Sequence, residues 1–157
     1  MDLIDFKILM ELQDNPQVSA SDLATKVGLS HTPCWRRVKK LEADGVIRER
    51  AIILDAVALG LPVVVFANIK LRQHDEETLE ALEVAARARD EITECYSMSG
   101  DADYILRVVV RSIEEYEALL KKVLLHLPGV SSVQSHFALK CIKNTTRLPI
   151  RVPERIV

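Results

Sequence analysis

The sequence predicts an α+β protein with two parts that differ in periodicity. Apolar side chains recur at helical spacing in the first part, which is predicted to form three short helices. The second part alternates as strand, helix, strand, strand, helix, strand, the βαββαβ order of ferredoxin-like domains. With 157 residues, the chain is long enough for two small domains. The expected parts are a first domain at 1–50, a hinge with a short strand at 51–61, a second domain at 62–143 and a tail at 144–157.

Each of the three N-terminal helices follows a residue that can cap it: Asp2, Ser19 and Ser30. The first helix is expected to end at Asn15-Pro16, because proline disfavours the α conformation of the residue before it. The second is expected to end at Gly28, where a positive φ is wanted. Two helices joined by a short turn that contains glycine form the outline of a helix-turn-helix motif.

The third predicted helix has one apolar and one basic side. Cys34, Val38 and Leu41 share the inner side, whereas four of the five residues 36–40 are basic. The positive charge is local: residues 31–50 hold six basic and three acidic side chains, in a chain whose net charge is −2. Such a cluster can neutralise the phosphates of duplex DNA, and arginine can also bond to guanine edges.

DNA contact is therefore predicted for the start and the outer side of this helix. We expect base readout from His31, Thr32 and Arg36, with Arg37, Lys39 and Lys40 nearer the phosphates. The full predicted set is Ser30, His31, Thr32, Pro33, Arg36, Arg37, Lys39 and Lys40. The alternative is an ordinary solvated helix face.

Two further residues of this helix each allow two interpretations. Trp35 is expected in the core rather than on DNA. Cys34 is expected to be a small packed hydrophobe. A redox-sensing Cys34 is the alternative, and it would require a lowered thiol pKa.

The predicted strands of the second part carry apolar side chains on both faces. Over residues 103–111, Ile105 and Val109 lie on one face, and Tyr104, Leu106, Val108 and Val110 lie on the other. A ferredoxin-like sheet has both helices on one face, so something must cover the second face. A second copy of the chain is the simplest cover. We therefore expect an obligate dimer, which would space two recognition helices for palindromic sites.

The segment Gly100–Tyr104 joins two of these strands. Its composition favours an ordinary hairpin turn, for which glycine and aspartate are typical. Its two carboxylates and its tyrosine would also suit a ligand that bears both an ammonium and a carboxylate group.

Six motifs, in the same order along nearly the whole chain, resemble the Lrp/AsnC (feast/famine) family of bacterial and archaeal transcriptional regulators. They are Gly28-Leu29-Ser30, Thr32-Pro33-Cys34-Trp35-Arg36-Arg37-Val38, Leu41-Glu42-x-x-Gly45-Val46-Ile47, Ser99-Gly100-Asp101-x-Asp103-Tyr104-Ile105-Leu106, Leu127-Pro128-Gly129-Val130 and Lys143-x-Thr145-Thr146-x-Leu148-Pro149. The resemblance implies a winged helix-turn-helix domain and a C-terminal domain that senses amino acids. It also implies dimers formed through the sheets and assembled into octamers that wrap DNA.

The effector in such relatives lies between dimers, near the strand loop that corresponds to Gly100–Tyr104. The effector-binding residues implied here are Met98, Gly100, Asp101, Ala102, Asp103, Tyr104, Leu127 and Val130. The motifs are most similar to a subgroup with cysteine- and leucine-responsive members.

We therefore expect a sequence-specific, amino-acid-responsive transcriptional regulator. The alternative is an architectural protein that wraps DNA with little sequence preference. An enzyme is not expected, because the four histidines lack HExxH spacing and no nucleophile elbow or phosphate loop occurs.

No cofactor, metal or membrane partner is expected either. The three cysteines lie too far apart for a zinc clip, and the longest apolar stretch, 56–67, is too short to cross a bilayer. The N-terminus lacks a signal peptide, so a cytoplasmic, nucleoid-associated location is expected.

Overall fold

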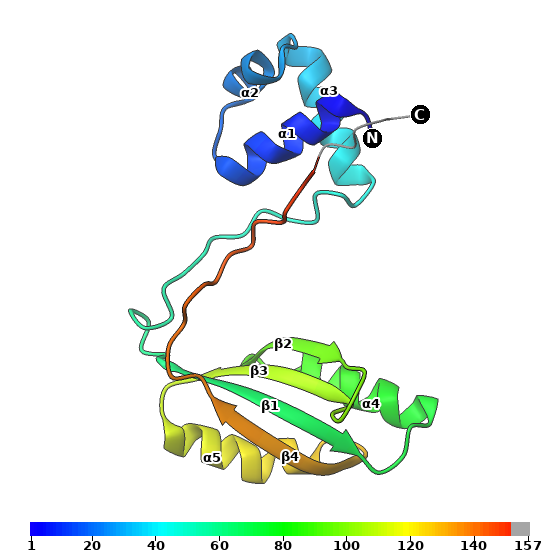
Figure 1. The fold of residues 1–157 in the computed structure, drawn as a ribbon, viewed down its shortest axis with the longest axis vertical. Helices are drawn as coiled ribbons and strands as arrows, with labels where there is room; N and C mark the ends of the chain where they lie inside the picture. Colours follow the sequence, from blue (N-terminus) through cyan, green and yellow to red (C-terminus); the bar gives the residue numbers. More distant parts are fainter. Residues whose placement is uncertain (152–157) are drawn as a thin grey trace. The chain divides into compact units, whose positions relative to one another are not determined.

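The computed structural model describes residues 1–151 and divides into two compact units (Figure 1). The first unit combines residues 1–53 with the segment that begins at Lys143. The second unit is Leu54–Ile142. Part of the predicted tail, residues 152–157, lies outside the described residues. Within 1–151, no helix is both long and apolar enough to cross a membrane.

The described part of the first unit contains three helices, which begin where the capping signals predict. They are α1 (Leu3–Asp14), α2 (Ala20–Val27) and α3 (His31–Ala43). The Asp2 carboxylate accepts hydrogen bonds from the N–H groups of Ile4 and Asp5, which closes a capping box. Ser19 caps α2, and Gly28 ends it with a φ of 73°. Ser30 precedes α3 but makes no side-chain cap bond.

The inner sides of the three helices form one small aliphatic core. Its buried members are Ile8, Leu9, Leu23, Ala24, Val27, Cys34, Val38 and Leu41. The C-terminal segment adds to this core, because Ile150 packs against it. Gln13 exchanges two hydrogen bonds with the backbone of Leu148, at 2.7 and 3.2 Å, and Arg147 forms an ion pair with Asp14. The tail therefore docks on α1, which its lack of periodicity did not indicate.

The short strand predicted at Ile52–Leu54 is wrong. No strand forms between α3 and β1 in the described chain, and Ile52 is 86% exposed. A strand needs a neighbour to complete its ladder, and no segment within residues 1–151 forms ladder hydrogen bonds with this one.

The second unit has the predicted βαββαβ order. Its elements are β1 (Val63–Leu71), α4 (Glu76–Arg87), β2 (Ile92–Ser97), β3 (Tyr104–Val110), α5 (Ile113–Lys122), the 3₁₀ turn η1 (Leu124–His126) and β4 (Val130–Phe137). The strands pair antiparallel in the order β2-β3-β1-β4. The last strand ends at Phe137 rather than at the predicted Ile142, because the last bond to β1 runs from the N–H of Ala138 to the carbonyl of Val64, one residue after β1 begins.

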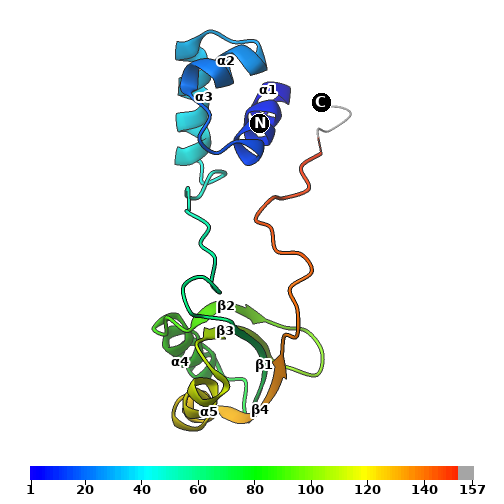
Figure 2. The same ribbon diagram turned by 90° about the vertical axis from the view of Figure 1, so that its left-hand side faces the viewer.

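Both helices, α4 and α5, cover the same face of the sheet (Figure 2). Under them lie alternate residues of the two central strands, including Val65, Ile69, Leu106 and Val108, all fully buried. The strand alternation predicted this face correctly. The opposite, helix-free face carries Val64, Phe66, Tyr96 and Ile105 beside Asn68, Arg107 and His136.

Candidate functional site

The exposed side of α3 carries most of the predicted DNA-contact residues. Cys34, Val38 and Leu41 fill the buried side, so the side chains at spacings of three and four on the other side face outward. Pro33 is half-buried in the first turn. The exposed members of the predicted set are Ser30, His31, Thr32, Arg36, Lys39 and Lys40.

Two exposed cations of α3, Lys39 and Lys40, pair with carboxylates near the C-terminal end of the same helix. Lys39 Nζ lies 2.7 Å from Glu42 Oε2, and Lys40 Nζ lies 2.5 Å from Asp44 Oδ2. Exposed pairs of this kind contribute little to stability, so a phosphate can replace the carboxylate. The ion pair with Asp44 raises the pKa of Lys40, which keeps it charged.

Arg37 lies on a different side of α3 from these cations. Its Nη1 donates to Asp2 Oδ2 at 2.7 Å and to Asp5 Oδ1 at 2.8 Å, across to the start of α1. The Asp5 and Asp2 carboxylates raise the pKa of Arg37. The N–H of Asp5 and the Arg37 guanidinium lower the pKa of Asp2 in turn. Arg37 therefore links α3 to the start of α1. Because its guanidinium is already bonded to two carboxylates, the structure does not support a phosphate contact for Arg37.

Two expectations for the residues before Arg36 have opposite outcomes. The core position expected for Trp35 is wrong, because 45% of its surface is exposed. Cys34 is packed as expected, and its burial raises the pKa of the thiol. A raised pKa is the reverse of what a redox-sensing cysteine requires.

The predicted effector residues come together at one end of the sheet. The chain enters β3 and β4 at the end where β1 finishes, because both strands run antiparallel to β1. Asp103 Oδ2 accepts a hydrogen bond from the N–H of Leu71 at 2.7 Å, and the carbonyl of Gly129 accepts one from Arg72 at 2.8 Å. The loop Gly100–Tyr104 and the turn Leu127–Val130 therefore flank the end of β1.

Asp103 braces this loop. Its second carboxylate oxygen lies 2.7 Å from His74 Nε2, and its N–H donates to the carbonyl of Ile69 at 2.9 Å. The N–H of Leu71 and the side chain of His74 lower the pKa of Asp103. The sequence alone did not reveal His74, which is 29 positions from Asp103. Both carboxylate oxygens of Asp103 are thus used within the chain.

The remaining predicted effector residues differ in exposure. Met98, Gly100 and Asp101 are exposed, and Ala102 is half-buried. Tyr104, Leu127 and Val130 are buried in the core of the second unit.

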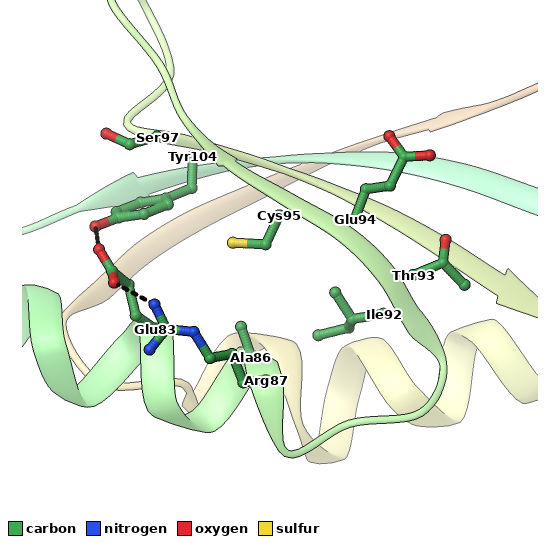
Figure 3. A pocket seen from close by; sticks show the side chains of 9 residues that line it. All are labelled: Glu83, Ala86, Arg87, Ile92, Thr93, Glu94, Cys95, Ser97 and Tyr104. Carbon is green, nitrogen blue, oxygen red and sulfur yellow. Dashed lines mark hydrogen bonds and ion pairs between the residues drawn. The ribbon is translucent and has the colours of Figure 1, made fainter. Parts of the chain in front are cut away.

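A cleft of about 350 Å³ lies beside Tyr104, between α4 and the edge strand β2 (Figure 3). Tyr104 Oη donates to Glu83 Oε1 at 3.2 Å, and Glu83 pairs with Arg87 at 3.0 Å. Burial and the Glu83 carboxylate raise the pKa of Tyr104, so its phenol keeps its proton. Cys95 lines the same cleft, and its pKa is raised by burial. Among residues 1–151, no group of three or more acidic, histidine or cysteine side chains could hold a metal.

Comparison with protein-family models identifies both units. Residues 64–148 match the Lrp/AsnC ligand binding domain, and residues 1–48 match a winged helix-turn-helix DNA-binding domain. The chain belongs to the Lrp/AsnC family. The resemblance in the motifs and the predicted fold class are thereby confirmed.

Individual relatives cover nearly the full length of this Lrp/AsnC regulator. The Leucine-responsive regulatory protein of Haemophilus influenzae is 41% identical over 151 residues, which is 96% of this chain and 91% of the relative. The DNA-binding transcriptional activator DecR of Escherichia coli is 37% identical over 150 residues, 96% of this chain and 99% of the relative.

Solved structures agree in fold. An AsnC family transcriptional regulator from Agrobacterium tumefaciens has a TM-score of 0.88 and 46% identity, covering 95% of this chain and 97% of that chain. A Neisseria meningitidis transcriptional regulator in complex with L-Met has a TM-score of 0.88 and 33% identity, covering 95% and 96%. The predicted function is confirmed: this chain is a DNA-binding transcriptional regulator with an amino-acid ligand-binding domain. The relatives named here are regulators, not enzymes.

Proposed function

We propose that the exposed side of α3 is the surface with which this regulator binds double-stranded DNA. The observation that carries the proposal is that Arg36, Lys39 and Lys40 project from α3 opposite its buried side. The proposed contact set is Ser30, His31, Thr32, Pro33, Arg36, Lys39 and Lys40, without Arg37.

Arg36 and Arg37 form a matched pair for testing this surface. Arg36→Gln and Arg37→Gln each remove one positive charge from adjacent positions of α3. An arginine that bonds to a base edge contributes about 1–3 kcal/mol of discrimination. We expect Arg36→Gln to weaken binding to a selected duplex by about that amount and Arg37→Gln to leave the affinity unchanged, as measured by fluorescence anisotropy. Equal changes in both variants would contradict the proposed surface.

Sequence-specific binding, rather than architectural wrapping, is the mode we propose. Four of the five residues 36–40 are basic in a chain whose net charge is −2. This local concentration of positive charge supports local contact over wrapping of long DNA. A specific binder should prefer its selected site over random duplex by about 10³-fold or more. A ratio near one would favour the architectural alternative.

The amino-acid effector is proposed to bind at the loop Gly100–Tyr104, with Met98 and the Leu127–Val130 turn beside it. Asp101 is exposed and can meet an ammonium group, whereas Asp103 is already bonded to Leu71 and His74. The L-Met complex of the Neisseria neighbour and the leucine named in the Haemophilus relative support an amino acid as the effector. The effect on DNA would follow from an effector that binds one assembly state more tightly than another.

Thermal unfolding in the presence of each of the twenty amino acids tests this assignment. A ligand at 100 times its dissociation constant adds about 2.7 kcal/mol to the stability of the folded state. Asp101→Asn should abolish the ligand-induced shift while the unliganded melting temperature stays unchanged. A full shift in that variant would show that the effector binds elsewhere.

Assembly through the helix-free face of the sheet is the remaining proposal, with dimers that associate further into octamers. Phe66 and Tyr96 are exposed on this face in the single chain, and a second copy would cover them. Phe66→Glu should convert the dimer to monomer in sedimentation velocity, because it places a charge in the covered face. Val84→Glu, which places the same charge on the exposed side of α4 and away from this face, is the control for charge alone. Because double-stranded DNA is its proposed partner, we also expect this protein to be associated with the nucleoid.

A further inference from the structure

Trp35 is an apolar side chain on the charged, exposed side of α3. It is the single tryptophan of the chain, and 45% of its surface is open to solvent. The core of the first unit does not need it, since Cys34, Val38 and Leu41 already fill the buried side of α3. Tryptophan combines a large apolar ring with one N–H donor, a combination enriched where proteins bind other molecules.

The ring of Trp35 is held in place by its neighbours on the helix. Lys39 Nζ lies over the ring, 4.6 Å from its centroid. The same ammonium group donates to Glu42 Oε2 at 2.7 Å. A cation over one ring face restrains the side chain, so part of the rotamer entropy is lost before any partner arrives.

We propose that Trp35 is a specificity-determining residue that packs against the C5-methyl group of thymine in the major groove. This inference rests on the proposed DNA contact of α3. Arg36 adjoins Trp35 in the chain and Lys39 lies against its ring, so phosphate attraction to these cations draws a duplex toward the ring.

The chemistry of the groove selects the methyl group. The major-groove edges of guanine, cytosine and adenine present hydrogen-bond donors and acceptors, and the thymine methyl is the apolar group among them. An indole ring that covers a donor or acceptor strips it of water without replacing the lost bonds. An indole ring that covers a methyl group removes apolar surface from water on both sides. The ring therefore favours A·T pairs at the position it reaches.

Intrinsic tryptophan fluorescence gives a direct first test, because Trp35 is the single tryptophan of the sequence. The probe is a duplex that the wild-type chain selects from a random-sequence pool. We expect saturating duplex to quench or blue-shift the emission and to protect it from iodide. An emission spectrum and iodide quenching that are both unchanged at saturation would overturn the inference.

The decisive test replaces thymine by deoxyuridine, which removes only the methyl group. The wild-type chain should bind the deoxyuridine form of the selected duplex about fourfold more weakly, from the transfer free energy of one carbon group. Trp35→Ala should bind both forms with the same affinity, and Trp35→Phe should keep the preference for thymine. Leu3→Ala, which alters a 44% exposed side chain of α1, is the control and should retain the full fourfold ratio. Circular dichroism confirms that each variant is folded.

The outcomes separate this inference from the proposed function. Equal thymine-to-deoxyuridine ratios in the wild type and in Trp35→Ala would overturn the inference alone, provided that Arg36→Gln still weakens binding to the selected duplex. A uniform loss of affinity in Trp35→Ala, with the ratio kept, would show a contact to the sugar-phosphate backbone and also overturn it. Failure of the wild type to bind any duplex would overturn the proposed contact of α3 together with it.

Discussion

Replacing Gly129 by alanine tests the packing of the turn between η1 and β4, because alanine at this position has two separate energetic costs, one from its φ and one from a steric clash. Gly129 has a φ of +72°, and a Cβ added there would lie 2.2 Å from Thr78 Cγ2. A side chain in the left-handed region costs about 1–2 kcal/mol. Thr78 cannot rotate away freely, because its hydroxyl donates to Asp75 at 2.8 Å and its N–H donates to the same carboxylate. Overpacking of this kind costs about 1–3 kcal/mol, so we expect a total loss of about 2–5 kcal/mol.

Thermal unfolding followed by circular dichroism measures this loss, at about 4–8 °C per kcal/mol for a domain of this size. Thr78→Ser removes the clashing methyl group and keeps the hydroxyl, so in that background Gly129→Ala should retain only the cost of its φ. Gly60→Ala is the matched control, since Gly60 has a φ of +76° and no atom within 4 Å of an added Cβ. Equal losses for Gly129→Ala and Gly60→Ala would refute the packing argument.

Three further predictions concern the cores and the acid range. Leu106→Ala, at a fully buried position, should lower the free energy of unfolding by about 2–5 kcal/mol in urea, whereas a loss below 1 kcal/mol would contradict the assigned core. The pKa of Asp103 is lowered in the folded chain by Leu71 N–H and His74, so its stabilisation is present above the unfolded value near 3.9 and is lost as pH falls through the folded pKa. Asp103→Asn should therefore flatten the loss of stability below about pH 4 in acid titrations, and an unchanged acid limb would argue against the brace. Cys34, buried and with a raised pKa, should be alkylated more slowly than exposed Cys141 in peptide mass spectrometry at pH 7.5, and equal rates would reopen the redox alternative.

Features set by neighbouring residues along the chain could be predicted from the sequence. Asp2, Ser19 and Gly28 mark helix ends through contacts to residues at most a few positions away, so the signal lies in the sequence itself. The alternation of Tyr104 and Leu106 with Ile105 likewise fixes which face of β3 is buried, because side chains of a strand point to opposite faces in turn.

Features set by distant residues could not be predicted in this way. The sequence shows Arg37 within a basic run, but its partners Asp2 and Asp5 lie 35 and 32 positions away. The strand expected at Ile52–Leu54 failed for the related reason that β propensity does not supply a pairing neighbour. Trp35 was expected in the core from its residue type, whereas the smaller side chains of Cys34 and Val38 occupy the space available there.

The docking of Ile150 and Arg147 on the first helices makes that unit discontinuous in the chain. During synthesis, residues 1–53 leave the ribosome well before Arg147 and Ile150, which complete their packing. A product cut short by a premature stop codon between the two segments would contain α1, α2 and α3 without these contacts.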